Sequence, residues 1–401
     1  MSAPENPALV PAEARRARGA VGALFFTNGA LFANLVPRYP EIKAALDLDN
    51  AAYGVAIAAF AAGALTVGLA AAPLIRRFGS ARVAAAGTIM VGLGALAAGV
   101  APWVLAFALA LFVAGALDAI TDVAQNAHGL RVQRVYGRSI LNTFHAIWSI
   151  GAVTGGVMAA GAIALGLPRG VHLTISAVLF SAVSLTALRF CLPGPDHDEP
   201  SSDDAVERAR RNAPAPRTIL VLVALAVIAI GGSTVEDAGL SWAAVYLSDS
   251  LSAPAELAAT GFVALVGAQF VGRLLGDRLV DRFGQRAVAR AGALIAAIGL
   301  GSALAFPSVP GSIAGFAAAG FGVATLIPAA MNQADRLPGF RPGTGLTLLS
   351  WLLRLGFLLS PPTIGAIADA TDLRTGLLVV PVACVVVAVL AFALAPRHPA
   401  R

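Results

Sequence analysis

The chain has 401 residues, of which 58% are hydrophobic and only 12% charged, and its mean hydropathy is +0.79. Soluble domains carry about 25% charged residues, so this composition excludes a water-soluble globular protein and indicates an integral membrane protein. The net charge of +6 comes almost wholly from arginine. Because the arginines stand in short segments between apolar stretches, they indicate membrane topology and not a nucleic-acid partner.

Twelve apolar stretches are each long enough to cross a bilayer as an α-helix, which takes about 20 residues. We place them at residues 19–37, 51–74, 83–101, 103–128, 140–166, 170–191, 217–247, 256–279, 288–306, 310–333, 343–367 and 375–395. The first stretch has no small-residue cleavage site, so we interpret it as a membrane span and not as a signal peptide. The expected fold class is all-α integral membrane.

Basic residues concentrate in alternate loops. With the N-terminus inside, 22 of the 28 basic residues fall on the inner side, and Arg38, Lys43, Arg169 and Arg374 fall on the outer side. This positive-inside bias predicts that both termini face the cytoplasm.

One segment interrupts the apolar pattern near the middle of the chain. Residues 193–216 contain five prolines, mixed charge and no apolar face. We interpret them as a cytoplasmic linker between an N-terminal six-helix bundle, residues 1–192, and a C-terminal six-helix bundle, residues 217–401.

The two bundles carry an internal repeat. Arg76-Arg77-Phe78-Gly79 is echoed 205 positions later by Asp281-Arg282-Phe283-Gly284, and each tetrapeptide joins two long apolar stretches. Two related bundles with the same orientation predict a pseudo-two-fold axis along the membrane normal, and a binding site at their interface near the bilayer midplane. This is the usual architecture of a secondary transporter.

The second copy of the repeat resembles a loop of the major facilitator superfamily. Residues 281–286 are similar to the family pattern G-x3-D-R-x-G-R-R, whereas Arg76 stands where the pattern has Asp. In the family this loop latches the outward-facing state by pairing with neighbouring helix ends. The resemblance therefore implies a twelve-helix transporter, usually a monomer, with a gating role for these residues: Asp281, Arg282, Gly284 and Arg286, and in the first bundle Arg76, Arg77 and Gly79.

Several longer stretches are similar to the bacterial YbjJ-like branch of that superfamily, whose substrates are poorly defined. They are residues 40–43, 122–126, 144–149, 236–247 and 356–365. The chain departs from the branch at Ser241, where Asp is expected, and at Arg354, where an aromatic residue is commoner. The fifth span also lacks the Gly-Pro step of the drug–proton antiporter pattern, which weakens a multidrug-exporter interpretation.

Ionisable residues inside predicted spans are candidates for function, because a charge at the centre of a spanning helix costs about 2.5–3.5 kcal/mol on insertion scales. We expect Glu236 and Asp122 to carry protons. Asp237 points about 100° away from Glu236 on a helix, and Asp118 shares a face with Asp122; both are weaker candidates. The alternative for each acid is a structural ion pair.

Further polar and aromatic side chains are candidates for lining a substrate cavity. They are Arg354, Asn126, His145, Trp148, Asn28, Gln269 and Trp242. Arg354 needs a partner, which could be Glu236, Asp122 or a substrate group. Trp242 could instead belong to an aromatic belt at the outer interface. Arg273 and Asp277 are spaced to pair with each other.

These observations predict a proton-coupled secondary transporter of a small solute that works by alternating access, with the lipid bilayer as its surroundings. We expect no cofactor other than the proton, no metal site and no enzymatic activity, since no nucleophile–base or ligand cluster and no ATP-binding P-loop occurs in the sequence. The alternative is a proton-driven exporter of lipophilic or cationic compounds. A remote alternative is a membrane receptor or enzyme that transports nothing.

Overall fold

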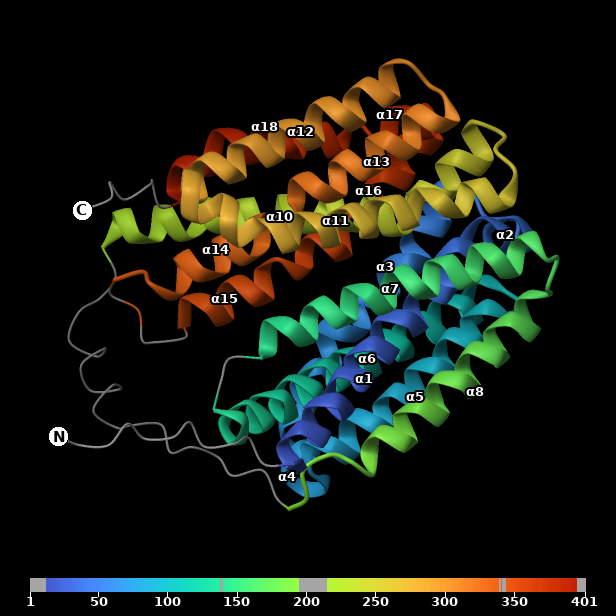
Figure 1. Ribbon diagram of the computed structural model, residues 1–401. Helices are drawn as coiled ribbons and strands as arrows, with labels where there is room; N and C mark the ends of the chain where they lie inside the picture. Colours follow the sequence, from blue (N-terminus) through green and yellow to red (C-terminus); the bar gives the residue numbers. More distant parts are fainter. Residues whose placement is uncertain (1–11, 138–139, 195–214, 339, 341–343, 395–401) are drawn as a thin grey trace.

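The computed structural model describes residues 12–137, 140–194, 215–338, 340 and 344–394. Within these residues the protein is helical, and twelve helices or helix chains are long and apolar enough to cross a membrane. The predicted all-α membrane fold is therefore confirmed. Figure 1 shows the first six spans, from blue to green, as one bundle beside a second bundle drawn from yellow to red. Residues 195–214 of the predicted linker lie outside the described residues.

The first bundle contains spans 1 to 6. Its elements are α1 (Ala12–Leu35), η1 (Val36–Arg38), α2 (Tyr39–Ala45), α3 (Asn50–Val67), η2 (Gly68–Ala70), α4 (Ala71–Phe78), α5 (Ser80–Gly99), α6 (Val104–Tyr136), α7 (Leu141–Ala164) and α8 (Arg169–Leu188). Because the spans alternate in direction, the loops lie at two ends of the molecule. We call the end where α1 begins the terminal end and the other the far end.

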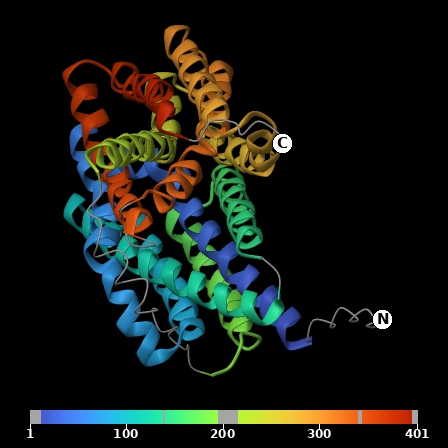
Figure 2. The same ribbon diagram turned by 90° about the vertical axis from the view of Figure 1, so that its left-hand side faces the viewer.

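The second bundle contains spans 7 to 12 and follows the same alternation, so its last helix also finishes at the terminal end. Its elements are α10 (Pro216–Val245), η3 (Tyr246–Ser250), α11 (Ala255–Phe283), α12 (Gln285–Ala305), α13 (Val309–Val323), α14 (Leu326–Asp335), α15 (Thr344–Leu352), α16 (Arg354–Ala370), α17 (Leu373–Gly376), α18 (Val379–Leu390) and η4 (Ala391–Ala393). The view in Figure 2 separates the two bundles clearly.

Spans 2, 10 and 11 are interrupted, whereas the sequence predicted continuous helices at 51–74, 310–333 and 343–367. In span 2 the 3₁₀ turn η2 separates α3 from α4. Span 10 breaks between α13 and α14, where Pro328 has no N–H to donate to the carbonyl of Ala324. Span 11 breaks between α15 and α16, where the Ser233 hydroxyl donates a 2.7 Å hydrogen bond to the Leu353 carbonyl and competes with the helical ladder. Arg354 begins the helix that follows the break in span 11.

The two repeated tetrapeptides have the same local structure. Gly79 has φ 84° and ψ 145°, and Gly284 has φ 85° and ψ 153°, a positive-φ conformation that glycine adopts without strain. In each loop the preceding arginine lies over the neighbouring phenylalanine ring, at 5.2 Å for Arg77 and 5.3 Å for Arg282. The repeat seen in the sequence is therefore also a repeat of backbone geometry.

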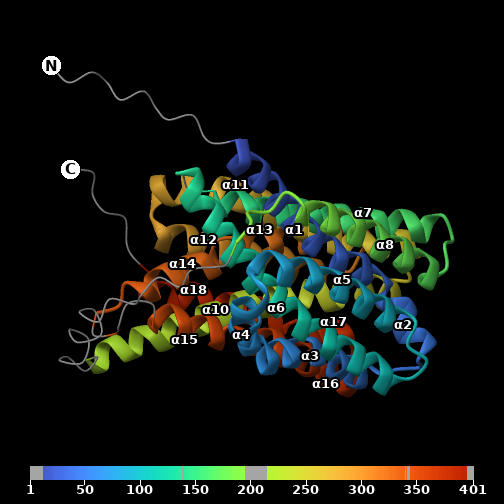
Figure 3. The same ribbon diagram turned by 90° about the horizontal axis from the view of Figure 1, so that it is seen from below.

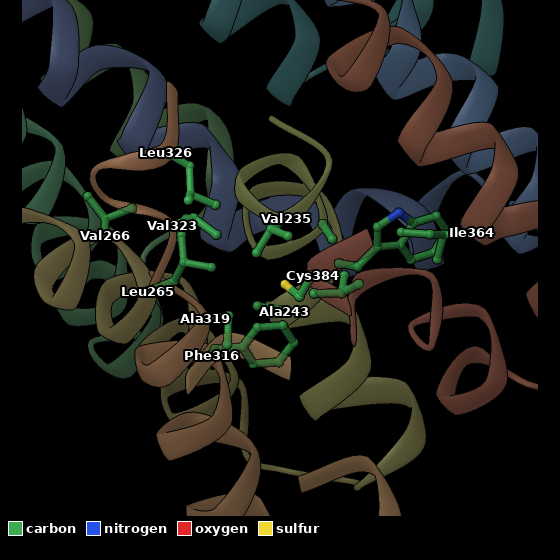
Figure 4. Packing of buried hydrophobic residues seen from close by; sticks show 14 of the residues in the cluster. Val235, Ala243, Leu265, Val266, Phe316, Ala319, Val323, Leu326, Ile364 and Cys384 are labelled. Carbon is green, nitrogen blue, oxygen red and sulfur yellow. The ribbon is translucent and has the colours of Figure 1, made fainter. Parts of the chain in front are cut away.

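The core of the second bundle surrounds α10, which is buried along most of its length. Figure 4 shows Val235 and Ala243 of α10 among apolar side chains from several other helices, with Leu265 and Val266 from α11 and Phe316 from α13. A central helix of this kind positions its few polar residues accurately, because its rotation and height are fixed by packing on all sides.

Glycine permits close helix packing between α3 and α6. A β-carbon on Gly115 would meet the backbone carbonyl of Phe60, and one on Gly63 would meet that of Phe112. Small residues at such crossings let helix backbones approach where lipid provides no hydrophobic driving force.

We expect Gly115→Leu to destabilise the protein by about 1–3 kcal/mol, because the added side chain would force the α3 and α6 backbones apart. The readout is the apparent Tm of the purified protein in detergent. Gly161→Leu is the matched control, since a β-carbon there meets no heavy atom within 4 Å. Equal apparent Tm values for Gly115→Leu and Gly161→Leu would contradict the packing argument.

Candidate substrate cavity

A cavity of about 260 Å³ lies between the two bundles. The first bundle contributes Asn28, Gly29, Phe32, Ala33, Tyr39, Ile57, Phe60, Ala61, Ala64, Asp118, Ala119, Asp122, Trp148 and Ala152, and the second contributes Glu236, Asp237, Leu240, Ser241, Phe262, Val266, Gln269, Arg354 and Phe357. Most of these side chains are apolar, and the polar ones are few and convergent. Such a composition is typical of a binding site for a small molecule.

Six of the nine residues predicted for proton coupling or substrate binding line this cavity. They are Asn28, Asp122, Trp148, Glu236, Gln269 and Arg354. Asn126, His145 and Trp242 are not among the lining residues. Trp242 is fully buried at the contact between the bundles, where it packs edge-on against Tyr53 at 4.9 Å between ring centroids, and not in an outer aromatic belt.

In the first bundle three side chains of the cavity wall, from α7, α1 and α6, are linked by hydrogen bonds. The Trp148 Nε1–H donates to Asn28 Oδ1 at 2.7 Å, and Asn28 Nδ2 donates to Asp118 Oδ1 at 2.8 Å. Asn28 thus uses both ends of its amide to hold an indole from α7 and a carboxyl group from α6. The sequence ranked Asp118 below Asp122, because nothing in the linear pattern showed that Asn28 would face it.

Asp122 also faces the cavity, one turn along α6 from Asp118. Asn126 Nδ2 donates to its carboxylate at 3.0 Å and to its backbone carbonyl at 2.9 Å. His145 lies within electrostatic reach of Asp122, and its ring contacts the edge of Phe25 at 5.3 Å between centroids. Asn126 and His145 therefore adjoin Asp122 without lining the cavity themselves.

In the second bundle Glu236 pairs with Arg273, and not Arg273 with Asp277 as the sequence spacing suggested. Arg273 Nη2 lies 3.9 Å from Glu236 Oε1, and Nη1 donates to the Ser149 hydroxyl of α7 at 3.2 Å. The pair predicted from the i,i+4 spacing on α11 does not form, because the guanidinium of Arg273 instead contacts a carboxylate on α10 and a hydroxyl of the other bundle. Arg273 thereby links the two bundles.

Asp237, a weaker candidate than Glu236 in the sequence, is buried and lines the same cavity as Glu236. Its side chain is only 5% exposed; Oδ1 accepts from the Ser241 hydroxyl at 3.1 Å, and Oδ2 has no hydrogen-bond partner among the described residues. A buried carboxyl oxygen without a hydrogen-bond partner is costly in a membrane interior.

Arg354 lines the cavity together with four acids, all of which belong to other helices. It lies within electrostatic reach of Asp118 and Asp122, yet within the described residues no carboxylate comes within 4.0 Å of it. Its guanidinium is therefore available to the cavity. Across the described part of the chain, no cluster of three or more His, Cys, Asp or Glu side chains could hold a metal ion.

Contacts between the bundles close the cavity at the far end. α3 packs along α16, and α7 along α11, as the view from below shows for the first pair (Figure 3). The Tyr53 hydroxyl donates to the Ser241 carbonyl at 2.6 Å, and Lys43 Nζ pairs with Asp249 Oδ2 at 3.0 Å. Asp369 of α16 accepts from the backbone N–H groups of Asn50 and Ala51, at 3.0 and 2.7 Å, at the start of α3.

The predicted gating loops lie at the terminal end, away from these contacts. Arg286 donates from Nη2 to the carbonyls of Phe392 and Leu394, at 2.7 and 3.1 Å, and so binds the end of the last helix of its own bundle. Among the described residues, no ion pair joins either loop to the opposite bundle. The gating prediction for Asp281, Arg282, Arg76 and Arg77 is not tested by this arrangement.

Asp369 offers a test of the far-end closure. Asp369→Asn removes the negative charge that the N-terminus of α3 attracts, so we expect the bundles to separate more often at the far end. Spin labels at Ala45→Cys and Ala255→Cys, both exposed at that end, would report a longer distance by pulsed electron resonance, with Cys191 and Cys384 replaced by Ala.

Asp372→Asn is the matched control. Asp372 Oδ1 accepts from the Thr375 N–H at 2.7 Å within one bundle, and this hydrogen bond lowers the pKa of its carboxyl group. Because asparagine caps a helix about as well as aspartate, Asp372→Asn should leave the distance between the labels unchanged. An unchanged distance in Asp369→Asn would show that this carboxylate does not hold the far end closed.

Comparison with known proteins identifies the family. The model of the Major Facilitator Superfamily matches residues 21–278 and 227–401. The uncharacterized transporter y4wD of Sinorhizobium fredii is 30% identical over 371 residues, which cover 92% of this chain and 96% of that protein. The membrane protein MosC of Rhizobium meliloti is 28% identical, over 92% of this chain and 88% of that protein.

Solved structures agree in fold at low sequence identity. The nucleoside transporter NupG superposes with a TM-score of 0.73 at 14% identity, covering 94% of this chain and 99% of that one. A D-xylose–proton symporter superposes with a TM-score of 0.71 at 16% identity, covering 96% and 98%. The chain, a multi-pass membrane transporter, belongs to the Major Facilitator Superfamily.

Proposed function

We propose that this protein is a proton-coupled secondary transporter that moves a small solute across a bacterial inner membrane by alternating access of its two bundles. The observation that carries the proposal is the cavity between the bundles, whose wall holds four carboxyl groups, Asp118, Asp122, Glu236 and Asp237. Carboxyl groups with such different surroundings can bind and release protons at different steps of a transport cycle.

The direction of the present opening follows from topology. If the 22 basic residues of the alternate loops mark the cytoplasmic side, the terminal end is cytoplasmic and the closed far end is periplasmic. The conformation would then be closed to the outside, as in the inward-facing bacterial Spinster homologue, which superposes with a TM-score of 0.72 at 14% identity. In the outward-facing state the loop residues Asp281 and Arg282 would form the cytoplasmic latch.

Asp237 and Glu236 would have different roles in proton coupling. Glu236 has a cation beside it in Arg273, whereas Asp237 has none among the described residues and lies next to the far-end contact at Ser241. Closure of the far end would keep Asp237 neutral, and its hydration on opening would favour release of the proton. Asp122, which is exposed to the cavity, would interact with the substrate.

The cavity favours a solute that donates hydrogen bonds. Four carboxyl groups accept, whereas Arg354 is the one guanidinium in the lining, and Phe32, Phe60 and Phe262 offer flat apolar surfaces. A polyhydroxylated solute fits this combination, and among the structural neighbours one transports nucleosides and another couples D-xylose to protons. Membership of the YbjJ-like branch and a monomeric state form part of the same proposal.

The cavity lining has more carboxyl groups than guanidinium groups, which also supports a second candidate function, the export of lipophilic cations. Such a compound would place its positive charge near Asp122 or Glu236 and its apolar part on the aromatic wall. It would compete directly with protons, so its affinity would fall on acidification, whereas a neutral polyol would be retained at low pH.

A thermal-shift screen followed by transport in proteoliposomes would test the proposal. Sugars, polyols, organic acids and lipophilic cations are compared at two pH values, and a ligand at 100 times its Kd should stabilise the protein by about 2.7 kcal/mol. We expect a polyol to bind, and its uptake to require a proton gradient. Accumulation of the polyol at the full level without a proton gradient would contradict proton coupling, and binding without counterflow would indicate a receptor.

Variants assign the roles of the cavity residues. Asp237→Asn should abolish proton-driven accumulation while leaving counterflow, and Arg354→Ala should weaken substrate binding. Glu256→Gln is the control, because Glu256 is exposed at the start of α11 and outside the cavity. Proton-driven accumulation at the normal level in Asp237→Asn would remove Asp237 from the coupling mechanism. Binding that depends on Glu236, and is confined to lipophilic cations, would support export.

A further inference from the structure

A second hollow lies on the outer face of the first bundle, remote from the substrate cavity. It is a groove of about 480 Å³ between α1 and α8, at the terminal end. Its lining consists of Arg16, Gly19, Ala20, Ala23, Leu179, Ala182, Val183, Thr186, Ala187 and Phe190. In Figure 1 α8 forms the outer edge of the bundle, so the groove faces the surrounding bilayer. The proposed transport function makes no use of it.

The length of the groove matches one leaflet. The lining extends from Leu179 of α8 to Phe190, two residues past the end of that helix, and eleven steps at 1.5 Å per residue give about 16 Å. Half of a hydrocarbon core of about 30 Å is about 15 Å. A single acyl chain of the leaflet at the terminal end therefore has the right length to fill it. A partner transmembrane helix would instead need a contact that continues through both leaflets.

The groove has a positive charge at its outer end only. Arg16 is the one charged residue of its lining and is exposed, and Arg189, next to Phe190, is exposed as well. Glu13 lies one turn before Arg16, but within the described residues no ion pair engages either arginine. Arg18, by contrast, donates a 2.8 Å hydrogen bond to the Tyr136 hydroxyl. The unpaired guanidinium groups thus lie where the headgroup of a lipid seated in the groove would be.

The floor of the groove is made of small residues. A β-carbon on Gly19 would meet no heavy atom within 4 Å, so the space above this residue is open, and Ala23 and Ala182 continue the floor toward the midplane. Side chains of this size leave a channel in which methylene groups can bury apolar surface.

We propose that this groove is a binding site for one anionic glycerophospholipid of the leaflet at the terminal end, with an acyl chain between α1 and α8 and the phosphate at Arg16. Guanidinium groups bind phosphate oxygens with paired hydrogen bonds, and each basic residue near a membrane surface contributes about fivefold to the affinity for anionic lipid. A zwitterionic lipid fills the same groove with less affinity, because the positive charge of its headgroup repels the arginine.

Native mass spectrometry of the full chain tests the site. The purified protein is incubated with equal amounts of phosphatidylglycerol and phosphatidylcholine that carry the same acyl chains, and the lipid retained is counted. We expect one phosphatidylglycerol to be retained in preference, and Arg16→Gln to lower that preference about fivefold. Arg15→Gln is the matched control, because Arg15 is exposed on the same turn but does not line the groove.

Gly19→Leu tests the groove separately from the charge. The leucine side chain fills open space, so the protein should fold with the Tm of Gly161→Leu, a glycine with equally open surroundings on α7, yet lose the retained lipid of either kind. Equal retention of the two lipids by the parent protein would overturn the proposal. Phosphatidylglycerol retained by Gly19→Leu as well as by Gly161→Leu would also overturn it.

Discussion

The contact between α3 and α16 is the interaction on which the rest of the structure depends. It is made of apolar and backbone surface where Gly54 meets Pro361 and Gly365 meets Asn50, and it ends in the carboxylate of Asp369 at the N-terminus of α3. Because one bundle supplies the acid and the other the helix N-terminus, the bond exists only while the bundles are together at the far end. Everything between them, including the cavity, takes its shape from that closure.

The low dielectric of a membrane interior explains why the cavity is built as it is. A polar side chain there needs a partner, and Asn28 satisfies Asp118 and Trp148 at once, whereas Arg273 satisfies Glu236 and Ser149. Against this background Asp237, with one carboxyl oxygen unpartnered among the described residues, stands out. A buried group left unsatisfied in one conformation lowers the cost of reaching another, which is the property that a coupled transport cycle needs.

The two bundles have diverged while keeping one design. The loops at Gly79 and Gly284 retain the same dihedral angles and the same arginine–phenylalanine contact. Both bundles contain interrupted spans: η2 separates α3 from α4 in the first, and Pro328 and the Ser233 hydroxyl interrupt the helical ladder in the second. The break in span 11 places Arg354 at a helix start that lines the candidate substrate cavity.

The sequence by itself determined the membrane-spanning helices, their number and the repeat, because apolar length and glycine turns act locally. It also nominated most of the polar residues of the cavity, since a polar side chain in an apolar span is conspicuous. The choice among partners was decided only by the tertiary structure. Arg273 bonds to Glu236 and Ser149, Trp242 lies in the closed interface, and Asp118 and Asp237 join the cavity, because these relations depend on the height and rotation of helices distant in sequence.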